Sequence, residues 1–201
     1  MKLRKKIKMK SKLSICIILL IFNTALQAQK SNFDIMVKNK TVGEATITKK
    51  NISDTEYSIK YTFDASITIL FITTTVDMDI LMSYKNNQLV EGNVNYLYNN
   101  KRTITKYKWN GSSYDVDQDG KKSRLNEKVL FSTMNLYEKE PLGVKKIFLE
   151  NQNEFTEIKN LGNNTYFAKV DGDDCTYTYK NAELQKILID AFVNITIIRK
   201  N

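Results

Sequence analysis

The chain has 201 residues, with 31 Lys and Arg against 22 Asp and Glu, no His and two Cys. Its length predicts a single domain. Because it has no His, Ser-His-Asp and Cys-His catalysis and His-based metal sites are excluded. The sequence thus excludes several classes of function but does not identify the function. We expect neither a cofactor nor a bound metal.

The net charge of +9 comes mostly from residues 1–28, which carry seven Lys and Arg and no acidic residue. The rest of the chain carries 24 Lys and Arg against 22 Asp and Glu, a net charge of +2. A nearly neutral domain has no electrostatic attraction to a phosphate backbone. We therefore expect no nucleic-acid partner.

The N-terminus has the three parts of a secretory signal peptide. Residues 1–12 are basic, residues 13–22 are almost entirely apolar, and residues 23–29 are small and polar, which predicts cleavage after Ala28. The apolar run of about ten residues is short against the roughly 20 that span a bilayer, which favours a cleaved signal over an uncleaved anchor. The prediction is a signal peptide at 1–28, an exported domain at 29–201 in the periplasm or outside the cell, and no membrane span after cleavage.

The two cysteines suggest no chemistry. Cys16 follows the bulky Ile15 and precedes the apolar run, so lipid attachment there is not expected. Cys175 is the single thiol of residues 29–201 and shares the parity of Tyr177 and Tyr179 in an alternating strand. A small buried side chain is the favoured interpretation.

Residues 57–84 alternate cleanly with period two, which is typical of strands with one wet face. Apolar residues occupy odd positions from Tyr57 to Phe71 and even positions from Val76 to Tyr84. A change of parity requires a turn or a bulge. No Gly, Pro or Asn occurs within 57–84, so the break is placed near 70–75, where both parities are apolar.

The rest of the chain repeats short strands and turns. Asn110-Gly111, Asp119-Gly120 and Asp171-Gly172 are strong hairpin signals, and no helix-length crossover separates the strands. One short helix is predicted over 132–138, closed by Pro141. The fold class is therefore all-β, a single large antiparallel meander curved into a barrel or half-barrel, with further strands expected at 90–98, 105–109, 166–170, 175–179, 184–190 and 193–197.

Two acidic patterns have competing interpretations. Residues 115–120 (DVDQDG) match the first half of a calcium loop, but Asn126 stands where the bidentate Glu is needed, which favours an Asp-Gly hairpin. Asp77 with Asp79, or Glu154 with Glu157, could form the carboxylate pair of a glycosidase. On the wet face of a strand such pairs are ordinary surface residues.

The inward-facing aromatic residues predict either a plain core or a cavity for an apolar ligand. The run at 67–72 (ITILFI) is apolar on both faces. A buried bend or a mouth covered by the helix is its favoured interpretation, and an exposed rim that meets lipid or a partner is the alternative. The candidate ligand-binding residues are Tyr61, Phe63, Ile67, Ile69, Leu70, Phe71 and Ile72.

Short motifs are spread over residues 33–199. They are Phe33-Asp34-Ile35, Val42-Gly43-Glu44, Leu136-Tyr137, Glu140-Pro141, Gly143, Ile147-Phe148, Phe155, Glu157-Ile158, Tyr177-Thr178-Tyr179, Asn181 and Leu184. Together these motifs resemble a family of small exported proteins of Gram-negative bacteria, domain of unknown function 6134. The resemblance implies export and an all-β fold, and it implies no catalytic residues. One departure is Ala182, where the family tends to have Gly.

The favoured function is that of an exported, non-enzymatic envelope protein that binds an apolar or lipid-like molecule, or an envelope protein, through a curved sheet. The alternatives are a carboxylate-based glycan hydrolase and a structural or assembly component of the envelope.

Overall fold

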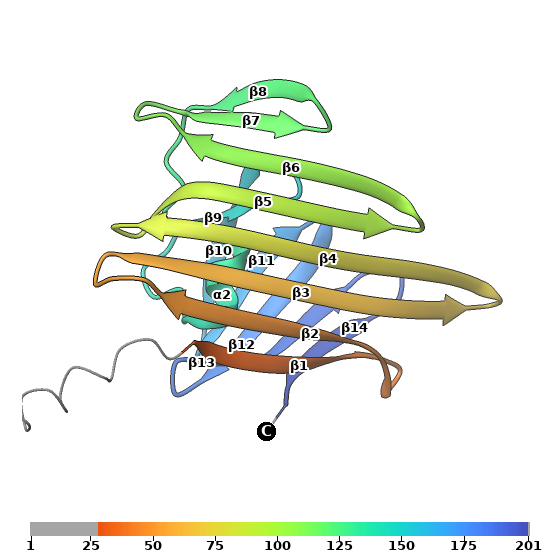
Figure 1. Cartoon of the computed structure of the whole chain (residues 1–201). Helices are drawn as coiled ribbons and strands as arrows, with labels where there is room; N and C mark the ends of the chain where they lie inside the picture. The colour runs from red at the N-terminus through yellow and green to blue at the C-terminus, as the bar shows by residue number, and fades with distance from the viewer. Residues whose placement is uncertain (1–27, 201) are drawn as a thin grey trace, which may run out of the picture.

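The computed structural model describes residues 28–200 (Figure 1). The predicted signal segment and Cys16 therefore lie outside the described residues, apart from Ala28 at the predicted cleavage site. Within residues 28–200 the chain forms strands and one short helix, α2 (Thr133–Glu138). The strands are β1 (Gln29–Val37), β2 (Lys40–Asn51), β3 (Glu56–Ile69), β4 (Ile72–Lys85), β5 (Gln88–Tyr98), β6 (Lys101–Trp109), β7 (Tyr114–Gln118), β8 (Lys121–Leu125), β9 (Lys146–Leu149), β10 (Glu154–Gly162), β11 (Thr165–Val170), β12 (Asp173–Lys180), β13 (Glu183–Asp190) and β14 (Ile195–Arg199).

All fourteen strands belong to one sheet, in the order β8-β7-β6-β5-β4-β3-β2-β1-β14-β13-β12-β11-β10-β9. Adjacent strands are antiparallel, and the first and last strands pair, with Phe33 opposite Arg199. The edges are β8 and β9, which do not pair with each other, so the sheet is open. The predicted all-β antiparallel meander is confirmed, and of its two forms the half-closed one is correct.

The sheet rolls over so that β9–β14 form a layer behind the front strands, with α2 between the layers (Figure 1). The β9 edge packs against the inner face of β6. The Tyr107 and Phe148 rings meet edge to face with centroids 5.5 Å apart, and the Tyr107 hydroxyl donates to the Glu150 carbonyl oxygen at 2.6 Å. Side-chain packing therefore joins the two layers where backbone pairing does not.

Both sheet edges are protected. The β8 edge carries Lys121, Lys122 and Arg124, and charged side chains discourage pairing with another chain. The β9 edge is covered by the segment before α2, because the Phe148 N–H donates to the Phe131 carbonyl at 2.9 Å.

The helix predicted over 132–138 is confirmed. Ser132 is its N-cap residue, and the Ser132 N–H donates to Oδ1 of Asn135 at 2.8 Å. Met134, Leu136 and Tyr137 are buried. The helix thus fills the space between the layers with apolar side chains, and Pro141 follows three residues after its last residue.

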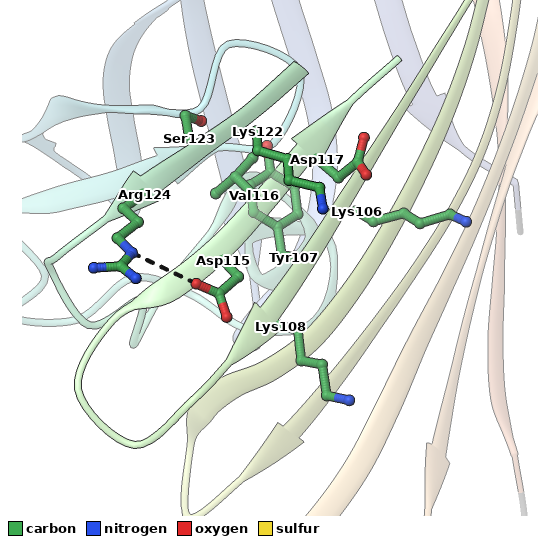
Figure 2. Close-up of a pocket in the computed structure, with 9 residues that line it drawn as sticks. All are labelled: Lys106, Tyr107, Lys108, Asp115, Val116, Asp117, Lys122, Ser123 and Arg124. Carbon is green, nitrogen blue, oxygen red and sulfur yellow. Dashed lines mark ion pairs between the residues drawn. The ribbon is translucent and has the colours of Figure 1, made fainter. Parts of the chain in front are cut away.

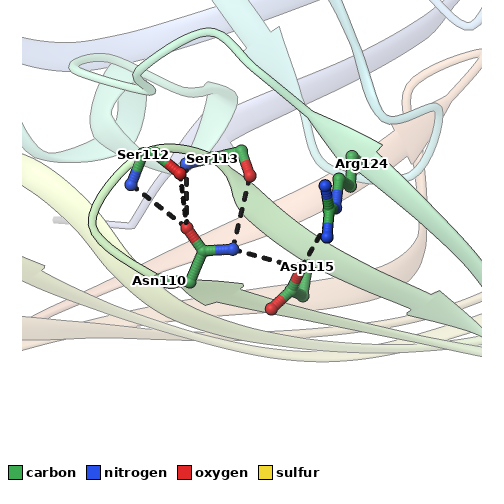
Figure 3. A network of polar contacts seen from close by, with 5 residues as sticks. All are labelled: Asn110, Ser112, Ser113, Asp115 and Arg124. Carbon is green, nitrogen blue, oxygen red and sulfur yellow. Dashed lines mark hydrogen bonds and ion pairs between the residues drawn. The ribbon is translucent and has the colours of Figure 1, made fainter.

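The predicted Asn and Asp turns are confirmed by left-handed φ angles, for example 50° at Asp119 and 84° at Gly120. In the β6–β7 turn, the Asn110 side chain accepts hydrogen bonds from the Ser112 and Ser113 N–H groups (Figure 3). The break expected near 70–75 is a two-residue turn at Leu70 and Phe71.

Candidate functional site

The two layers and α2 border a partly open cavity of about 160 Å³. Tyr61, Phe63, Met78 and Ile80 line it from β3 and β4. The opposite wall comes from β11–β14, from the end of β9 and from the helix, and it is mainly apolar. Its apolar residues are Met134, Tyr137, Leu149, Val170, Cys175, Tyr177, Ile187, Ile189 and Ile197, and its polar residues are Thr133, Glu150, Asn151 and Asp171.

A pair of phenol groups supplies one polar point in this apolar wall. The hydroxyls of Tyr61 and Tyr137 lie 3.1 Å apart. Burial is the largest cause that raises the pKa of each phenol. Both groups therefore stay protonated and neutral, and together they form a hydrogen-bonded pair inside the core.

Glu150 supplies a second polar point, and it is 2% exposed. Its carboxylate accepts hydrogen bonds from the Thr133 hydroxyl and, at 3.1 Å, from the Met134 N–H. Burial raises the pKa of this carboxyl. Because its partners belong to the first turn of α2, Glu150 fixes the start of the helix to the end of β9.

Sequence reasoning missed Glu150 as a core residue. It follows the apolar residues of β9 directly, yet a single Glu at the end of a strand normally indicates exposure. Its burial depends on Thr133 and Met134, which lie 17 and 16 residues earlier in the chain. A sequence pattern within a few residues of Glu150 cannot predict contacts with residues so far away in the chain.

Cys175 is buried, as predicted, with 3% of its surface exposed. Burial is the main cause that raises the pKa of its thiol to about 12. The thiolate is the nucleophilic form, so this side chain is an inert part of the cavity wall.

The structure separates the predicted ligand-binding residues into two groups. Tyr61 and Phe63 line the cavity, and Ile67 is half-buried further along β3. The β3–β4 turn and its flank hold the rest. Ile69 pairs with Ile72 across the hairpin, and Leu70, Phe71 and Ile72 are 84%, 100% and 72% exposed. The prediction of a buried bend is therefore wrong for Leu70, Phe71 and Ile72, because the turn projects into solvent.

A second hollow, of about 520 Å³, lies over β6–β8 (Figure 2). Lys106 lies opposite Asp117, which lies opposite Lys122. Asp115 likewise lies between Lys108 and Arg124, and its carboxylate is 3.7 Å from the Arg124 guanidinium. Such alternating charges stabilise neighbouring strands, and this explains the hollow's composition without a ligand.

The 115–120 stretch forms the predicted Asp-Gly hairpin, and each of its carboxylates has another partner. Asp115 accepts from the Asn110 amide at 3.2 Å. Asp117 accepts from the Gly120 N–H and Asp119 from the Ile104 N–H, both at 2.8 Å. Among residues 28–200, no three acidic or Cys side chains are placed to share a metal ion.

The two acidic pairs considered for glycan hydrolysis lie outside the cavity. Asp79 forms an ion pair with Lys60 at 3.3 Å, and Asp77 lies opposite Asp64 on the next strand. Glu154 and Glu157 are exposed on β10. These carboxylates have the environment of surface residues.

The architecture defines a half-closed, rolled antiparallel β domain with a small apolar interior. The chain belongs to the family described as domain of unknown function DUF6134, which it matches over residues 33–200. The resemblance inferred from the short motifs is confirmed.

A solved structure shares this architecture. It is a β-barrel-like protein of the domain of unknown function DUF1849 from Brucella abortus, with 10% identity, a TM-score of 0.60, and coverage of 88% of this chain and 97% of that one. At this identity the similarity concerns the fold alone. No curated protein matches the sequence. In residues 28–200, no helix has the length and apolarity needed to cross a membrane.

Proposed function

We propose that this protein is an exported, non-enzymatic envelope protein that binds a small apolar group in the cavity beneath α2. The apolar lining around Tyr61, Phe63 and Met78 is the observation that carries the proposal. Apolar cavities of roughly 150 Å³ hold a molecule about the size of benzene, whereas most ligand sites have roughly 300–1,000 Å³. The volume thus favours a small ring or one end of a longer chain over a whole lipid.

Two polar groups of the cavity, Glu150 and Cys175, support binding over catalysis. The Glu150 carboxylate is engaged by Thr133 and Met134, and the pKa of the Cys175 thiol is raised to about 12. A catalytic group needs a pKa closer to the operating pH and a free face toward the substrate. A glycan hydrolase is the competing hypothesis. Burial raises the pKa of Asp171, the other carboxyl of the cavity, and peptidoglycan hydrolysis that disappears in Asp171→Asn would replace the binding proposal.

The cavity is tested with benzene as the probe. We expect benzene to raise the midpoint of thermal unfolding of the wild-type protein, because a ligand that binds the native state stabilises it. Val170→Phe fills the cavity wall and should abolish this rise. Leu161→Phe, at an exposed position of β10, should retain it. The proposal fails if benzene has no effect on the wild type, or the same effect on Val170→Phe.

Export is the second part of the proposal, and it is supported by the pattern of residues 1–28. Cell fractionation should find the protein in the envelope, with Gln29 as the first residue by mass spectrometry. Leu19→Lys interrupts the apolar run and should leave the uncleaved chain in the cytoplasm. An exported Leu19→Lys chain, or an intact N-terminus in the envelope, would contradict a cleaved signal.

A further inference from the structure

β3 and β4 extend past their neighbours at one end of the sheet. The pairing of β2 with β3 starts at Ala65, and that of β5 with β4 starts at Val76. Residues 66–75 are therefore matched in the ladder only with one another, and at their base Thr75 also exchanges hydrogen bonds with Asn99. Figure 1 shows the β3–β4 hairpin projecting beyond the other hairpins. We call residues 66–75 the ribbon. At about 3.3 Å per residue, its four residue pairs extend roughly 13 Å.

The ribbon is apolar where it is most exposed. No charged residue lies between Asp64 and Asp77, although 26% of the chain is charged. Leu70, Phe71 and Ile72 form the tip, and the Phe71 side chain is fully exposed. Large apolar side chains gathered at a protruding tip are unfavourable in water and mark a surface that meets another phase or molecule.

The turn at this tip is also conformationally unfavourable. Leu70 has φ 47° and Phe71 has φ 74°, a left-handed conformation that Gly, Asn and Asp adopt most readily. Other two-residue turns of the described chain use such residues, for example Asn86-Asn87, Asn99-Asn100 and Asp119-Gly120. A residue choice that is poor for the backbone and for solvation points to a function.

A second apolar protrusion lies at the same end of the molecule. Leu70 lines a groove of about 790 Å³ together with Phe192, from the loop between β13 and β14. Phe192 is 97% exposed. Lys38 and Lys186 line the same groove, and its lining contains no acidic residue. The groove therefore combines exposed apolar side chains with positive charge.

We propose that the ribbon tip and Phe192 insert into a lipid surface, with Lys38 and Lys186 facing anionic headgroups. Apolar anchors flanked by basic residues are the pattern of proteins that lie on a membrane. A narrow two-stranded ribbon offers little of the roughly 800 Å² per partner that a stable protein interface buries. Asp64 and Asp77 are six residues from the tip, roughly 20 Å along the strands. This distance exceeds the Debye length of about 8 Å, so the negative charges of these residues are screened from headgroups at the tip.

The first experiment places a fluorescent reporter at the tip. In the protein purified from the cell envelope, Phe71→Trp should show a blue-shifted emission on addition of phosphatidylcholine vesicles containing phosphatidylglycerol, because its indole enters the apolar phase. The matched control is Leu161→Trp, an exposed position next to the β10–β11 turn. The wild-type chain, with Trp109 as its one Trp, gives the background. The emission of a Trp depends on its own surroundings, so binding through another part of the chain does not by itself shift the emission at position 71.

The second experiment removes the anchors. Leu70→Asn with Phe71→Gly should weaken vesicle binding roughly tenfold or more relative to the wild-type chain, because two buried apolar side chains are lost. The same variant should unfold at an equal or higher temperature, since Asn-Gly suits this turn. Lys38→Glu with Lys186→Glu should weaken binding to anionic vesicles more than to pure phosphatidylcholine vesicles.

Three outcomes would overturn the proposal. One is the absence of a blue shift at position 71, and another is an equal shift at position 161. The third is a Leu70→Asn, Phe71→Gly variant that binds vesicles as the wild type does but loses crosslinking to an envelope protein, which would assign the tip to a protein partner. The benzene experiment on the cavity is independent of all three.

Discussion

Ala182 shows how a single side chain affects a turn. It has φ 63° in the β12–β13 turn, after Asn181 with φ 54°. A Cβ in the left-handed region costs roughly 1–2 kcal/mol, and Gly avoids this cost. The family resemblance implies Gly at this position, so the departure is expected to lower stability without changing the fold.

Ala182→Gly should therefore raise the free energy of unfolding by about 1 kcal/mol, after allowance for the larger entropy of Gly in the unfolded chain. Urea denaturation of the two proteins measures this difference. Ala168→Gly, in the buried part of β11, is the control and should lower stability. Equal midpoints for Ala182→Gly and the wild type would contradict the argument.

Gly43 is required for a different reason, the close approach of β2 and β3. A Cβ at Gly43 would lie 2.1 Å from the Asp64 carbonyl oxygen and 2.6 Å from the Ala65 Cα. Backbone atoms cannot move away as a side chain can. This contact gives a physical reason for the Val42-Gly43-Glu44 motif.

Gly43→Ala should lower the free energy of unfolding by about 2 kcal/mol or more, since overpacking strains the sheet. Gly92→Ala is the matched control. Its Cβ would meet the Met82 sulfur at 2.5 Å, and that flexible side chain can shift. Thermal unfolding should thus show a smaller loss for Gly92→Ala, and the reverse order would contradict the explanation.

At the scale of elements, α2 depends on a contact outside the helix. A helix of six residues is too short to be stable alone. Glu150 bonds to its first turn, and the Tyr179 hydroxyl donates to the Leu136 carbonyl at 2.8 Å. Strands on the layer behind therefore hold both ends of the helix over the cavity.

The Glu150 carboxyl makes stability depend on pH. Burial raises its pKa above the ordinary value of 4.5, so the folded chain binds this proton more readily than the unfolded chain. Its contribution to stability is fully present below pH 4.5 and is lost as pH rises through the raised pKa. A Gln side chain is neutral at every pH and lacks this loss.

The stability of Glu150→Gln relative to the wild type should therefore increase as pH rises above 4.5, measured by urea denaturation at a series of pH values. Glu138→Gln is the control. Burial is the largest cause that raises the pKa of both carboxyls, and Glu138 is only half-buried, so its effect should be smaller. Parallel stability curves for Glu150→Gln and the wild type would contradict the prediction.

Elements with periodic sequences were predictable, and their arrangement in layers was not. Alternation identified β3 and β4, and Asn-Gly or Asp-Gly pairs identified turns, because both signals act within a few residues. The turn at Leu70 and Phe71 was placed only within a range, since neither residue is a turn former. A cavity with Tyr61 and Phe63 in its wall was one of two predicted interpretations, but its opposite wall could not be predicted, because the Tyr61–Tyr137 contact joins residues 76 apart in the chain.

For the whole molecule, the pairing of β1 with β14 holds the layers together. β14 has five residues and contacts β1 on one side and β13 on the other. Without it both neighbours would have unpaired edges, which attract other chains. A short strand can thus be essential when it lies in the interior of a sheet.

Deletion of residues 195–201 should therefore prevent cooperative unfolding and cause aggregation, measured by calorimetry and by light scattering. Deletion of 121–125, the equally short edge strand β8, is the control. It exposes one edge of β7 and should leave a cooperative transition at lower temperature. If both deletions had the same effect on unfolding and aggregation, the position of a strand in the sheet would not explain its importance for stability.

The pairing of β1 with β14 also affects when the sheet can be completed during synthesis. β1 is made first and β14 last, yet Ile35 lies opposite Ile197. During synthesis, one edge of β1 stays unpaired until almost the whole chain has been made, and contacts between such distant residues form slowly. The growing chain exposes an unpaired strand throughout that period. A protein built in this way has reason to depend on a holding chaperone until its last residues emerge.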